Sequence, residues 1–536
     1  MAILTVYDIM GIQNFIFSSK ELKDNIGASK IVKDTLDIYL IDVIKENTKK
    51  CELNWKESSK FKMLEDSDIE AEILYIGGGN ALVIYKDKDI ESKITRKFSR
   101  VVFEKSYSLS VATAYIETNF ESFKEDKEKL FKSLDENKNS FLKTMPLMGI
   151  SITKQDLQTG LPISYIDKYN NLTRESFLKR ENIKQKGKAD NEDCYINDRE
   201  KYIFSNELDK LGKKTGESKI AVVHIDGNNM GNLIDELMQG INDYSEAVPK
   251  IRLISKEIDN CFRNAYKNTI NFIENKIDLI NKNNLIGLHH CYEKQILPIR
   301  SIILNGDDVT FVTNAKIALS VTEKFLKEIN NFESQIFKNK LSACAGICIA
   351  NSHFPFNKAY EISEECCGSA KSKAKYIAQK DNSDVKSCLD FHVIYSGVTS
   401  DLQSIRDNMY NVIDLGDPSD KKIKKYNLLQ RPYFVVPQNK ELHNIKDKDN
   451  FETFKKHHKD LKSDWPRTRL KKLREVFMKG RVETEVYLRE CRVRGYVLPK
   501  ISDYMDEEET GYYTDETSPY FDVIEMLDIY FDLGVE

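Results

Sequence analysis

Two short apolar runs that flank a polar turn stand out in the hydrophobic pattern of this chain. They form residues 302–312, IILNGDDVTFV, and are rich in Ile, Val, Phe and Thr, which favour paired strands. The turn between them holds Asn305, Gly306, Asp307 and Asp308. Asn and Gly tolerate positive φ, so the Asn-Gly pair favours a tight turn. The pattern therefore predicts a β-hairpin with two adjacent carboxylates at its tip.

These paired carboxylates have two interpretations. Adjacent anions repel each other, and a hard divalent cation such as Mg²⁺ would neutralise them while leaving positions open for phosphate oxygens. A solvated acidic turn is the simpler alternative. Residues elsewhere in the chain favour the first interpretation.

An apolar run that ends in an acid lies upstream, at 219–231, KIAVVHIDGNNMG. It predicts a buried strand that ends at Asp226, followed by a turn and a helix that begins near Met230. A carboxylate at the end of a strand, beside a carboxylate-tipped hairpin, is the arrangement of a two-metal phosphoryl-transfer site. We therefore expect Asp226, Asp307 and Asp308 to be catalytic and to bind two ions.

Further candidate residues surround these acids. A backbone carbonyl near Ile225 would add a metal ligand. Gly227, Asn228, Asn229 and Gly306 would line the nucleotide site, although the two asparagines could instead simply make the turn.

A third apolar run, at 341–349, LSACAGICI, predicts another buried strand, and a helix follows through Ala378. The helix carries Lys371 and Lys375, which are four residues apart and share one face. We expect Lys371, with Lys375, to neutralise a triphosphate. A pair of surface lysines is the alternative. Residues 390–394 are expected to form the edge strand of this sheet.

The apolar-turn-apolar pattern occurs a second time, at 73–85, ILYIGGGNALVIY. Its turn, Gly77 to Asn80, aligns position by position with Asn305 to Asp308, which indicates an internal repeat. This first copy lacks both hairpin carboxylates and should not hold two metals. It is either purely structural, or its residues Gly78, Gly79 and Asn80 let a nucleotide approach the backbone closely. Asp8, which aligns with Asp226, is expected to be a structural remnant.

The combined motifs resemble a known family. HIDGNNMG, LPIRSIILNGDDVTFV, SACAGICIANSHFPFNKAYEISEECCGSAKSKAK, DIMGIQNFIF and NIGASKIV are similar to the large polymerase-cyclase subunit of type III CRISPR systems, and more broadly to palm-type nucleotide cyclases. The resemblance covers residues 1–120 and 200–395. The family motif is usually Gly-Gly-Asp-Asp, and here Asn305 replaces its first Gly.

The resemblance implies an α+β fold with two ferredoxin-like palm domains, a helical insert and a C-terminal helical domain. It also implies binding of ATP between the palms, two Mg²⁺ or Mn²⁺ ions, and conversion of ATP to a cyclic oligonucleotide in antiviral defence. The expected partners are RNA, CRISPR effector subunits or a second copy of the chain. The alternatives are a cyclase that makes a cyclic dinucleotide or mononucleotide, and a non-catalytic scaffold or RNA-binding subunit.

From these patterns we expect a first palm at 1–120, a linker or insert at 121–217, a second, catalytic palm at 218–398 and a mainly helical domain at 399–536. No His-Asp pair suited to a metal nuclease precedes the first palm, so we expect no such nuclease domain. One basic helix, after Pro466, carries Arg469, Lys471, Lys472 and Arg474. We interpret its charge as a solvated face, and contact with nucleic acid or a partner is the alternative.

Composition narrows the picture further. The net charge of −4, from 81 basic and 85 acidic residues, is not that of a protein that coats nucleic acid. No apolar run approaches the ~20 residues that cross a bilayer, so we expect no membrane contact. The ten cysteines include no Cys-x-x-Cys pair, and the insert contains only Cys194, so we expect no zinc. A reducing cytoplasm is the simplest location.

Overall fold

The structure is a computed structural model of the chain. It describes residues 1–57, 59–140, 148–157, 159–166, 171–184, 192–212, 218–338, 341–395, 400–414, 424–435, 447–500, 510–513 and 515–534.

The first sheet is built from the short apolar runs of the N-terminal region. Its strand order is β2-β3-β4-β1-β5, and its four longer strands pair antiparallel. The strands are β1 (Ala2–Met10), β2 (Cys51–Glu52), β3 (Ala71–Gly77), β4 (Asn80–Tyr85) and β5 (Ser110–Thr118). The helices of this half are α1 (Ile12–Ile16), α2 (Leu22–Asp34), α3 (Ile41–Asn47), α4 (Lys88–Ser106) and α5 (Phe123–Ser140).

The second sheet repeats this topology and extends it. Its order is β12-β13-β9-β14-β15-β18, in which the first four strands correspond to β3-β4-β1-β5. The strands are β9 (Lys219–Gly227), β12 (Ile299–Asn305), β13 (Asp308–Asn314), β14 (Ala343–Asn351), β15 (Cys388–Val393) and β18 (Tyr433–Phe434). The helices are α7 (Met230–Met238), α8 (Tyr244–Lys282), α9 (Ala318–Asn330) and α10 (Phe356–Asp381). Two ferredoxin-like palms are confirmed.

The register of the two sheets confirms the repeat in detail. In each hairpin one pair closes the turn, Gly77 with Asn80 and Asn305 with Asp308. The strand pairing shifts between Ile73 and Tyr75 in the first hairpin, and between Ser301 and Ile303 in the second. Each irregularity therefore stands at the same place relative to its own turn. A bulge at equivalent positions gives both hairpins the same local bend.

One prediction about the second sheet was wrong. Residues 390–394 do not form an edge strand, because β15 pairs parallel with β14 on one side and antiparallel with β18 on the other. The two residues of β18 lie far along the chain, and periodicity does not show which strand they pair with.

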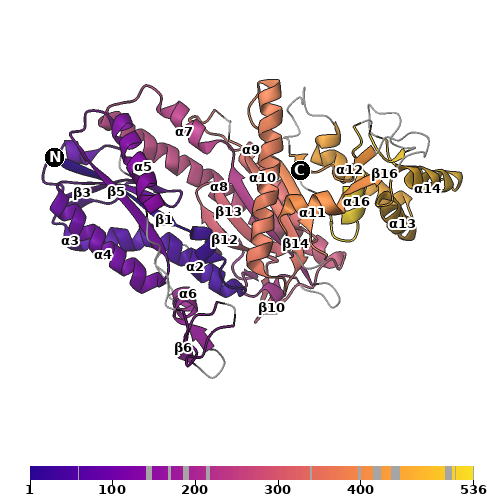
Figure 1. Cartoon of the computed structure of the whole chain (residues 1–536), viewed down its shortest axis with the longest axis horizontal. Helices are drawn as coiled ribbons and strands as arrows, with labels where there is room; N and C mark the ends of the chain where they lie inside the picture. Colours follow the sequence, from indigo (N-terminus) through magenta and orange to yellow (C-terminus); the bar gives the residue numbers. More distant parts are fainter. Residues whose placement is uncertain are drawn as a thin grey trace.

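A single long helix joins the two palms. Helix α8 has 39 residues and packs on both palms. Its first turns, including Tyr244 and Ile251, pack in the core of the first palm, and its later turns, from Ile254, pack in the core of the second. Arg252 donates to Glu72 and to two strand carbonyls of β3. Figure 1 shows α8 lying between the two halves.

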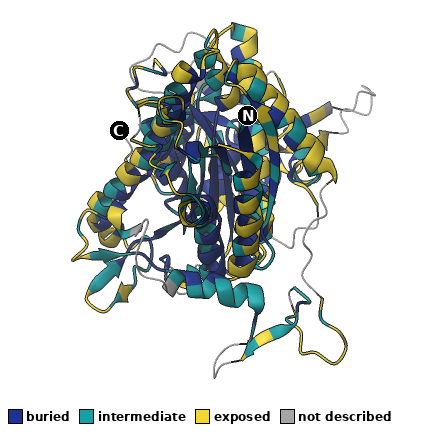
Figure 2. Cartoon of the chain, turned by 90° about the vertical axis from the view of Figure 1, so that its left-hand side faces the viewer, coloured by how far each residue is buried: buried dark blue, intermediate teal, exposed yellow. Residues whose placement is uncertain are grey.

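Smaller elements complete the chain. Helix α5 packs on β5 and β1, and α6 and the β6–β7 hairpin project from the first palm (Figure 1). The smaller elements before and within the second palm are β6 (Ile163–Ile166), β7 (Asn171–Thr173), α6 (Arg174–Lys184), β8 (Tyr202–Ile203), β10 (His290–Cys291) and β11 (Lys294–Ile296). The C-terminal part contains α11 (Leu402–Met409), β16 (Asn411–Asp414), β17 (Lys424–Asn427), α12 (Phe451–Asp464), α13 (Arg467–Phe477), α14 (Arg481–Val493) and α16 (Phe521–Met526). Buried residues gather along the sheets, and the outer faces of the helices are exposed (Figure 2).

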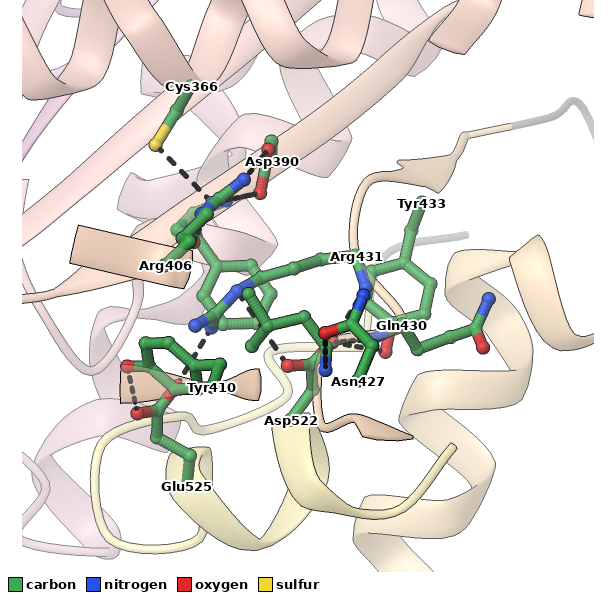
Figure 3. Close-up of polar contacts among 12 residues, drawn as sticks. Cys366, Asp390, Arg406, Tyr410, Asn427, Gln430, Arg431, Tyr433, Asp522 and Glu525 are labelled. Atoms are coloured by element: carbon green, nitrogen blue, oxygen red, sulfur yellow. Dashed lines mark hydrogen bonds and ion pairs between the residues drawn. The ribbon is translucent and has the colours of Figure 1, made fainter. Parts of the chain in front are cut away.

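A buried ionic network attaches the C-terminal part to the second palm (Figure 3). Arg431 donates to Glu525 at 2.8 Å, and Asp522 accepts the Arg431 backbone N–H at 2.7 Å. Arg406 binds Asp390 of β15 through two hydrogen bonds of 2.8 Å. Because burying a charge is costly unless it is paired, these contacts specify how α16 docks on the sheet.

Candidate active site

The hairpin turn differs in detail from the predicted Asn-Gly turn. Asn305 closes the hairpin by pairing with Asp308, so the two loop residues are Gly306 and Asp307. Gly306 has φ 59°, whereas Asn305 and Asp307 do not have positive φ. A Gly at the first loop position is typical of a II′ turn. The turn therefore depends on Gly306, and Asn305 serves as a strand residue.

The strand acid lies directly beside the hairpin acids. Asp226, the penultimate residue of β9, is paired in register with Asp308 of β13 and with Cys344 of β14. Gly227 N–H donates to the carbonyl of Asp307 at 3.3 Å. A Cβ on Gly227 would lie 2.9 Å from the Asp307 Cβ, so only Gly allows this approach. Asp226, distant in sequence, is therefore brought beside the two adjacent hairpin acids at one end of the sheet.

Crowding of these acids perturbs their protonation. Burial, with repulsion from Asp226, raises the pKa of Asp307 to about 6. Burial, with repulsion from Asp226 and Asp307, raises the pKa of Asp308 to about 8. The Oδ1 atom of Asp308 is buried and accepts no hydrogen bond. The ionised forms of the hairpin acids are thus disfavoured unless positive charge is brought to them.

One lysine already brings positive charge to the strand acid. The ammonium of Lys371 on α10 is hydrogen-bonded to Asp226 Oδ2 and donates to the Gly227 carbonyl at 3.1 Å. Lys375, one turn further along α10, is exposed. The two predicted phosphate-binding lysines are therefore placed differently, and only Lys371 contacts the acids.

The first palm has the same lysine–acid pair but not the hairpin acids. Asp8 Oδ2 lies 2.9 Å from the Nζ of Lys138 on α5, and Asn80, in the place of Asp308, donates to Asp8 Oδ1 at 3.2 Å. Lys138 occupies the same position counted from the start of α5 as Lys371 does from the start of α10. The pair is thus a feature of the repeated fold, and the hairpin carboxylates are what distinguish the second palm.

A cavity of about 350 Å³ opens between the two hairpin turns. Gly78, Gly79 and Asn80 line it from the first palm, and Gly306 and Asp307 line it from the second. Much of its remaining wall comes from α2, α7 and α8 and from the loop after β2, including Lys33, Trp55, Lys56, Asp259 and Arg263. Burial and the nearby Arg263 lower the pKa of Lys33 to about 8. The glycine-rich turn of the first palm therefore faces the acidic turn of the second across one cavity.

The remaining predicted residues have distinct positions. Asn228 is buried, and its amide donates to Ser342 Oγ at 3.0 Å, so it holds the turn. Asn229 is exposed and precedes α7 with φ 52°. Ile225 is fully buried in β9, paired with Val309 and Ala345.

Two residues near the acids escaped the sequence analysis. His224 lies two positions before Asp226, on the same face of β9, and its Nδ1 is 3.6 Å from Asp308 Oδ1. Burial lowers the pKa of His224 to about 4, so the ring is neutral at pH 7. Glu364, seven residues before Lys371 on α10, adds to the negative charge around Asp308. Strand alternation for His224 and the two-turn helical spacing for Glu364 were the available signals.

The donor set of this site fits a hard divalent cation. It consists of carboxylate oxygens, one of which is buried without a hydrogen bond, and their mutual repulsion favours a bound cation. However, among the described residues no three His, Cys, Asp or Glu side chains are placed together as a metal-binding group. Asp226 would have to exchange its contact with Lys371 for a metal contact.

Comparison with known proteins agrees with this geometry. Residues 219–382, from the start of β9 to just past the end of α10, match the family model described as Cas10/Cmr2, second palm domain. This stretch is a Cas10-type palm domain. The resemblance to the palm subunit of type III CRISPR systems is thereby confirmed. No curated protein matches the chain.

Solved structures extend the likeness beyond the Cas10-type palm. The "Csm1-Csm4 cassette in complex with one ATP" is 12% identical, with a TM-score of 0.51, and the match covers 99% of this chain and 70% of that chain. The "Csm1-Csm4 cassette in complex with cA4" is 13% identical, with a TM-score of 0.42, and the match covers 69% and 53% of the two chains. The chain thus spans about half the length (53%) of the first Csm1 chains it matches. At such low identity the first match shows a shared fold. Among the described helices, none is long and apolar enough to span a bilayer.

Proposed function

We propose that this protein is a metal-dependent nucleotidyltransferase that converts ATP to a cyclic oligonucleotide of the oligoadenylate type. The observation that carries the proposal is the pairing of Asp226 with Asp308, which follows Asp307 in the chain, in a Cas10-type palm. The cavity between the two hairpin turns supports it, because the cavity brings Asp307 and the first palm's glycine-rich turn to one space. A Csm1 chain of similar fold was solved with ATP.

In this proposal each group of the chain has a defined task. Asp226, Asp307 and Asp308 would hold Mg²⁺ or Mn²⁺, with the Ile225 carbonyl as a further ligand, and the ions would supply charge neutralisation at the reacting phosphate. Gly78 and Gly79, both with positive φ, allow a nucleotide to approach the backbone between the palms. Lys371, which is hydrogen-bonded to Asp226, would exchange this partner for a phosphate oxygen and neutralise the triphosphate. His224 is neutral and therefore adds no positive charge beside the acids.

Assembly with other CRISPR effector subunits is part of the proposal. The similar Csm1 chains were solved with Csm4. RNA or a second copy of this chain would be the alternative activating partner.

A second function, that of a non-catalytic scaffold or RNA-binding subunit, is favoured by one specific observation. The Lys371 ammonium is hydrogen-bonded to Asp226 and so occupies a carboxylate that the metal would need. Activity measurements separate the two functions.

The test is product analysis by mass spectrometry. The full chain is incubated with ATP and Mg²⁺ or Mn²⁺, with and without RNA, and then with mixed nucleoside triphosphates. We expect a cyclic oligonucleotide and pyrophosphate from wild type, and neither from Asp307→Asn. A cyclic dinucleotide or mononucleotide would replace the proposed product class, and the absence of pyrophosphate under every condition would favour the scaffold.

A further inference from the structure

A second, cationic cavity lies where the C-terminal part meets the second palm. It has a volume of about 210 Å³. Three of its cationic residues, Arg467, Lys471 and Arg474, lie at positions i, i+4 and i+7 of α13, and therefore on one face of the helix. The fourth, Lys219, is the first residue of β9. Two of the four basic residues that the sequence pattern assigned to solvent, Lys471 and Arg474, thus line a cavity.

This cavity is separate from the proposed active site. Lys219 and Asp226 lie at opposite ends of β9, seven residues apart, which corresponds to roughly 23 Å along a strand. A ligand bound at Lys219 would therefore not occupy the space between the hairpin turns.

The acids that line the cavity are already committed to other groups. Glu525 is fully buried and is bound by Arg431 and by the Tyr410 hydroxyl, both at 2.8 Å, as Figure 3 shows. Arg474 is also 3.6 Å from Glu525. Asp528 accepts from Arg467 at 2.7 Å. The cavity therefore has an excess of positive charge, which comes from Lys219 and Lys471.

An aromatic ring brings two of the cations together. The Nζ of Lys219 and the guanidinium of Arg474 each lie 4.8 Å from the ring of Tyr395. Burial, opposed by Glu525 and reinforced by Arg474, lowers the pKa of Lys219. Two cations crowded on one ring, with a third on the adjacent helix turn, form an arrangement that an anion would stabilise.

We propose that this cavity binds a phosphoryl group, held by Lys219, Lys471 and Arg474. A phosphomonoester carries close to two negative charges, which match Lys219 and Lys471, the two lining lysines with no ion pair to the described acids. Arginine adds the planar, two-pronged donor geometry that phosphate oxygens accept. The volume is below the ~300 Å³ at which ligand pockets usually begin, so the site accepts a phosphate group and leaves the rest of its carrier outside. The carrier is a free phosphate, a nucleotide or a 5′-phosphorylated RNA.

Calorimetric titration of the full chain with inorganic phosphate, at constant ionic strength, tests the proposal. The key variant is Lys219→Gln/Lys471→Gln. Its control, Lys459→Gln/Lys472→Gln, removes the same charge from two exposed lysines outside the cavity. We expect the key variant to lose one site, or at least about tenfold in affinity, and the control to bind like wild type. Equal binding by wild type and the key variant, or no saturable binding by wild type, would overturn the site.

Two further measurements distinguish phosphate binding by the cavity lysines from a purely structural role. Without phosphate the key variant should unfold at the wild-type temperature or higher, because crowded charge is removed. A clear drop would instead mean that the lysines serve stability, against the proposal. Lys471→Glu, at an exposed position, should also abolish phosphate binding.

Competition identifies the carrier. ATP, 5′-phosphorylated RNA and 5′-hydroxyl RNA are each added to the phosphate-bound protein. A carrier that displaces phosphate from wild type, and binds more weakly to the key variant, is the ligand. Competition by none of them identifies free phosphate. A competitor whose affinity is unchanged by the key variant acts elsewhere and counts against this site.

Discussion

At the scale of single residues, the site is defined by carboxylates that repel one another. Asp308 is paired with Asp226 across two strands, follows Asp307 in the chain, and has its pKa raised to about 8. Such an arrangement opposes stability and is retained where charge is needed for function. The corresponding position in the first palm is Asn80, which donates a hydrogen bond to Asp8 and removes the repulsion.

The first prediction concerns this position. Asp308→Asn should lower pyrophosphate release from ATP by at least about 100-fold, because a metal ligand is lost. It should also stabilise the fold, by about 1 kcal/mol at this partly exposed site, because repulsion is relieved. Activity and chemical unfolding measure the two effects. Asp8→Asn is the matched control in the first palm and should keep activity within about threefold. Wild-type turnover by Asp308→Asn would contradict the metal assignment.

A second prediction separates the two lysines of α10. Lys371 contacts Asp226, and Lys375 is exposed one turn away. Lys371→Gln should reduce kcat/KM for ATP by at least about tenfold, since a charge-assisted contact is lost. Lys375→Gln is the control, because it removes the same charge from the same helix. Its kcat/KM for ATP should remain near that of wild type. Equal losses in both variants would mean that Lys375 reaches the substrate.

At the scale of elements, the close approach of α10 to β14 positions the lysine. Gly346 lies at the centre of β14, and a Cβ there would lie 1.9 Å from the carbonyl oxygen of Ser363 and 2.3 Å from the backbone nitrogen of Cys367. Both atoms belong to the helix backbone, which cannot move aside without shifting α10. The position of Lys371 relative to Asp226 therefore depends on Gly346, which has no side chain.

The third prediction follows from this contact. Gly346→Ala should destabilise the protein by about 3 kcal/mol and lower activity as α10 is displaced. Gly368→Ala is the control, because a Cβ at Gly368 meets no atom within 4 Å, and alanine favours the helix by up to about 1 kcal/mol. Urea unfolding compares the two variants. A Gly346→Ala protein as stable as wild type would show that the helix tolerates a shift.

At the scale of the whole molecule, two sets of contacts hold the two palms and the C-terminal part together. Helix α8 contributes to the cores of both palms and so fixes the two hairpin turns on either side of the cavity. The network of Arg431 with Asp522 and Glu525 attaches the C-terminal part to the second palm (Figure 3). The α8 connection is mainly apolar, with one buried Arg252–Glu72 ion pair, whereas the C-terminal connection is a network of several buried charges.

The fourth prediction tests the ionic network. Arg431→Met removes the cation that two fully buried carboxylates share and should cost about 3–5 kcal/mol of stability. Arg494→Gln breaks an exposed i, i+4 pair with Glu490 and should cost less than about 1 kcal/mol. Guanidinium chloride unfolding provides the comparison. A loss below about 1 kcal/mol in Arg431→Met would mean that the carboxylates accept protons at little cost.

The sequence by itself determined the repeated palm fold and the candidate residues. Apolar runs around Gly-rich and acidic turns set the strands and hairpins because strand propensity and turn chemistry are local properties. The alignment of the two turns, one in each half of the chain, was visible in the same way. Local chemistry also singled out Asp226, Asp307, Asp308 and Lys371, whose roles stay predictions.

Tertiary structure decided what depends on segments far apart in the chain. It paired Asp226 with Asp308, engaged Asp226 with Lys371, and made β18 the edge of the sheet in place of β15. It also placed Lys471 and Arg474 of α13 in the lining of a cavity, together with Lys219 and Tyr395. Periodicity reports which face of an element is apolar, but only packing shows which distant side chains share a space and therefore which charges must be balanced.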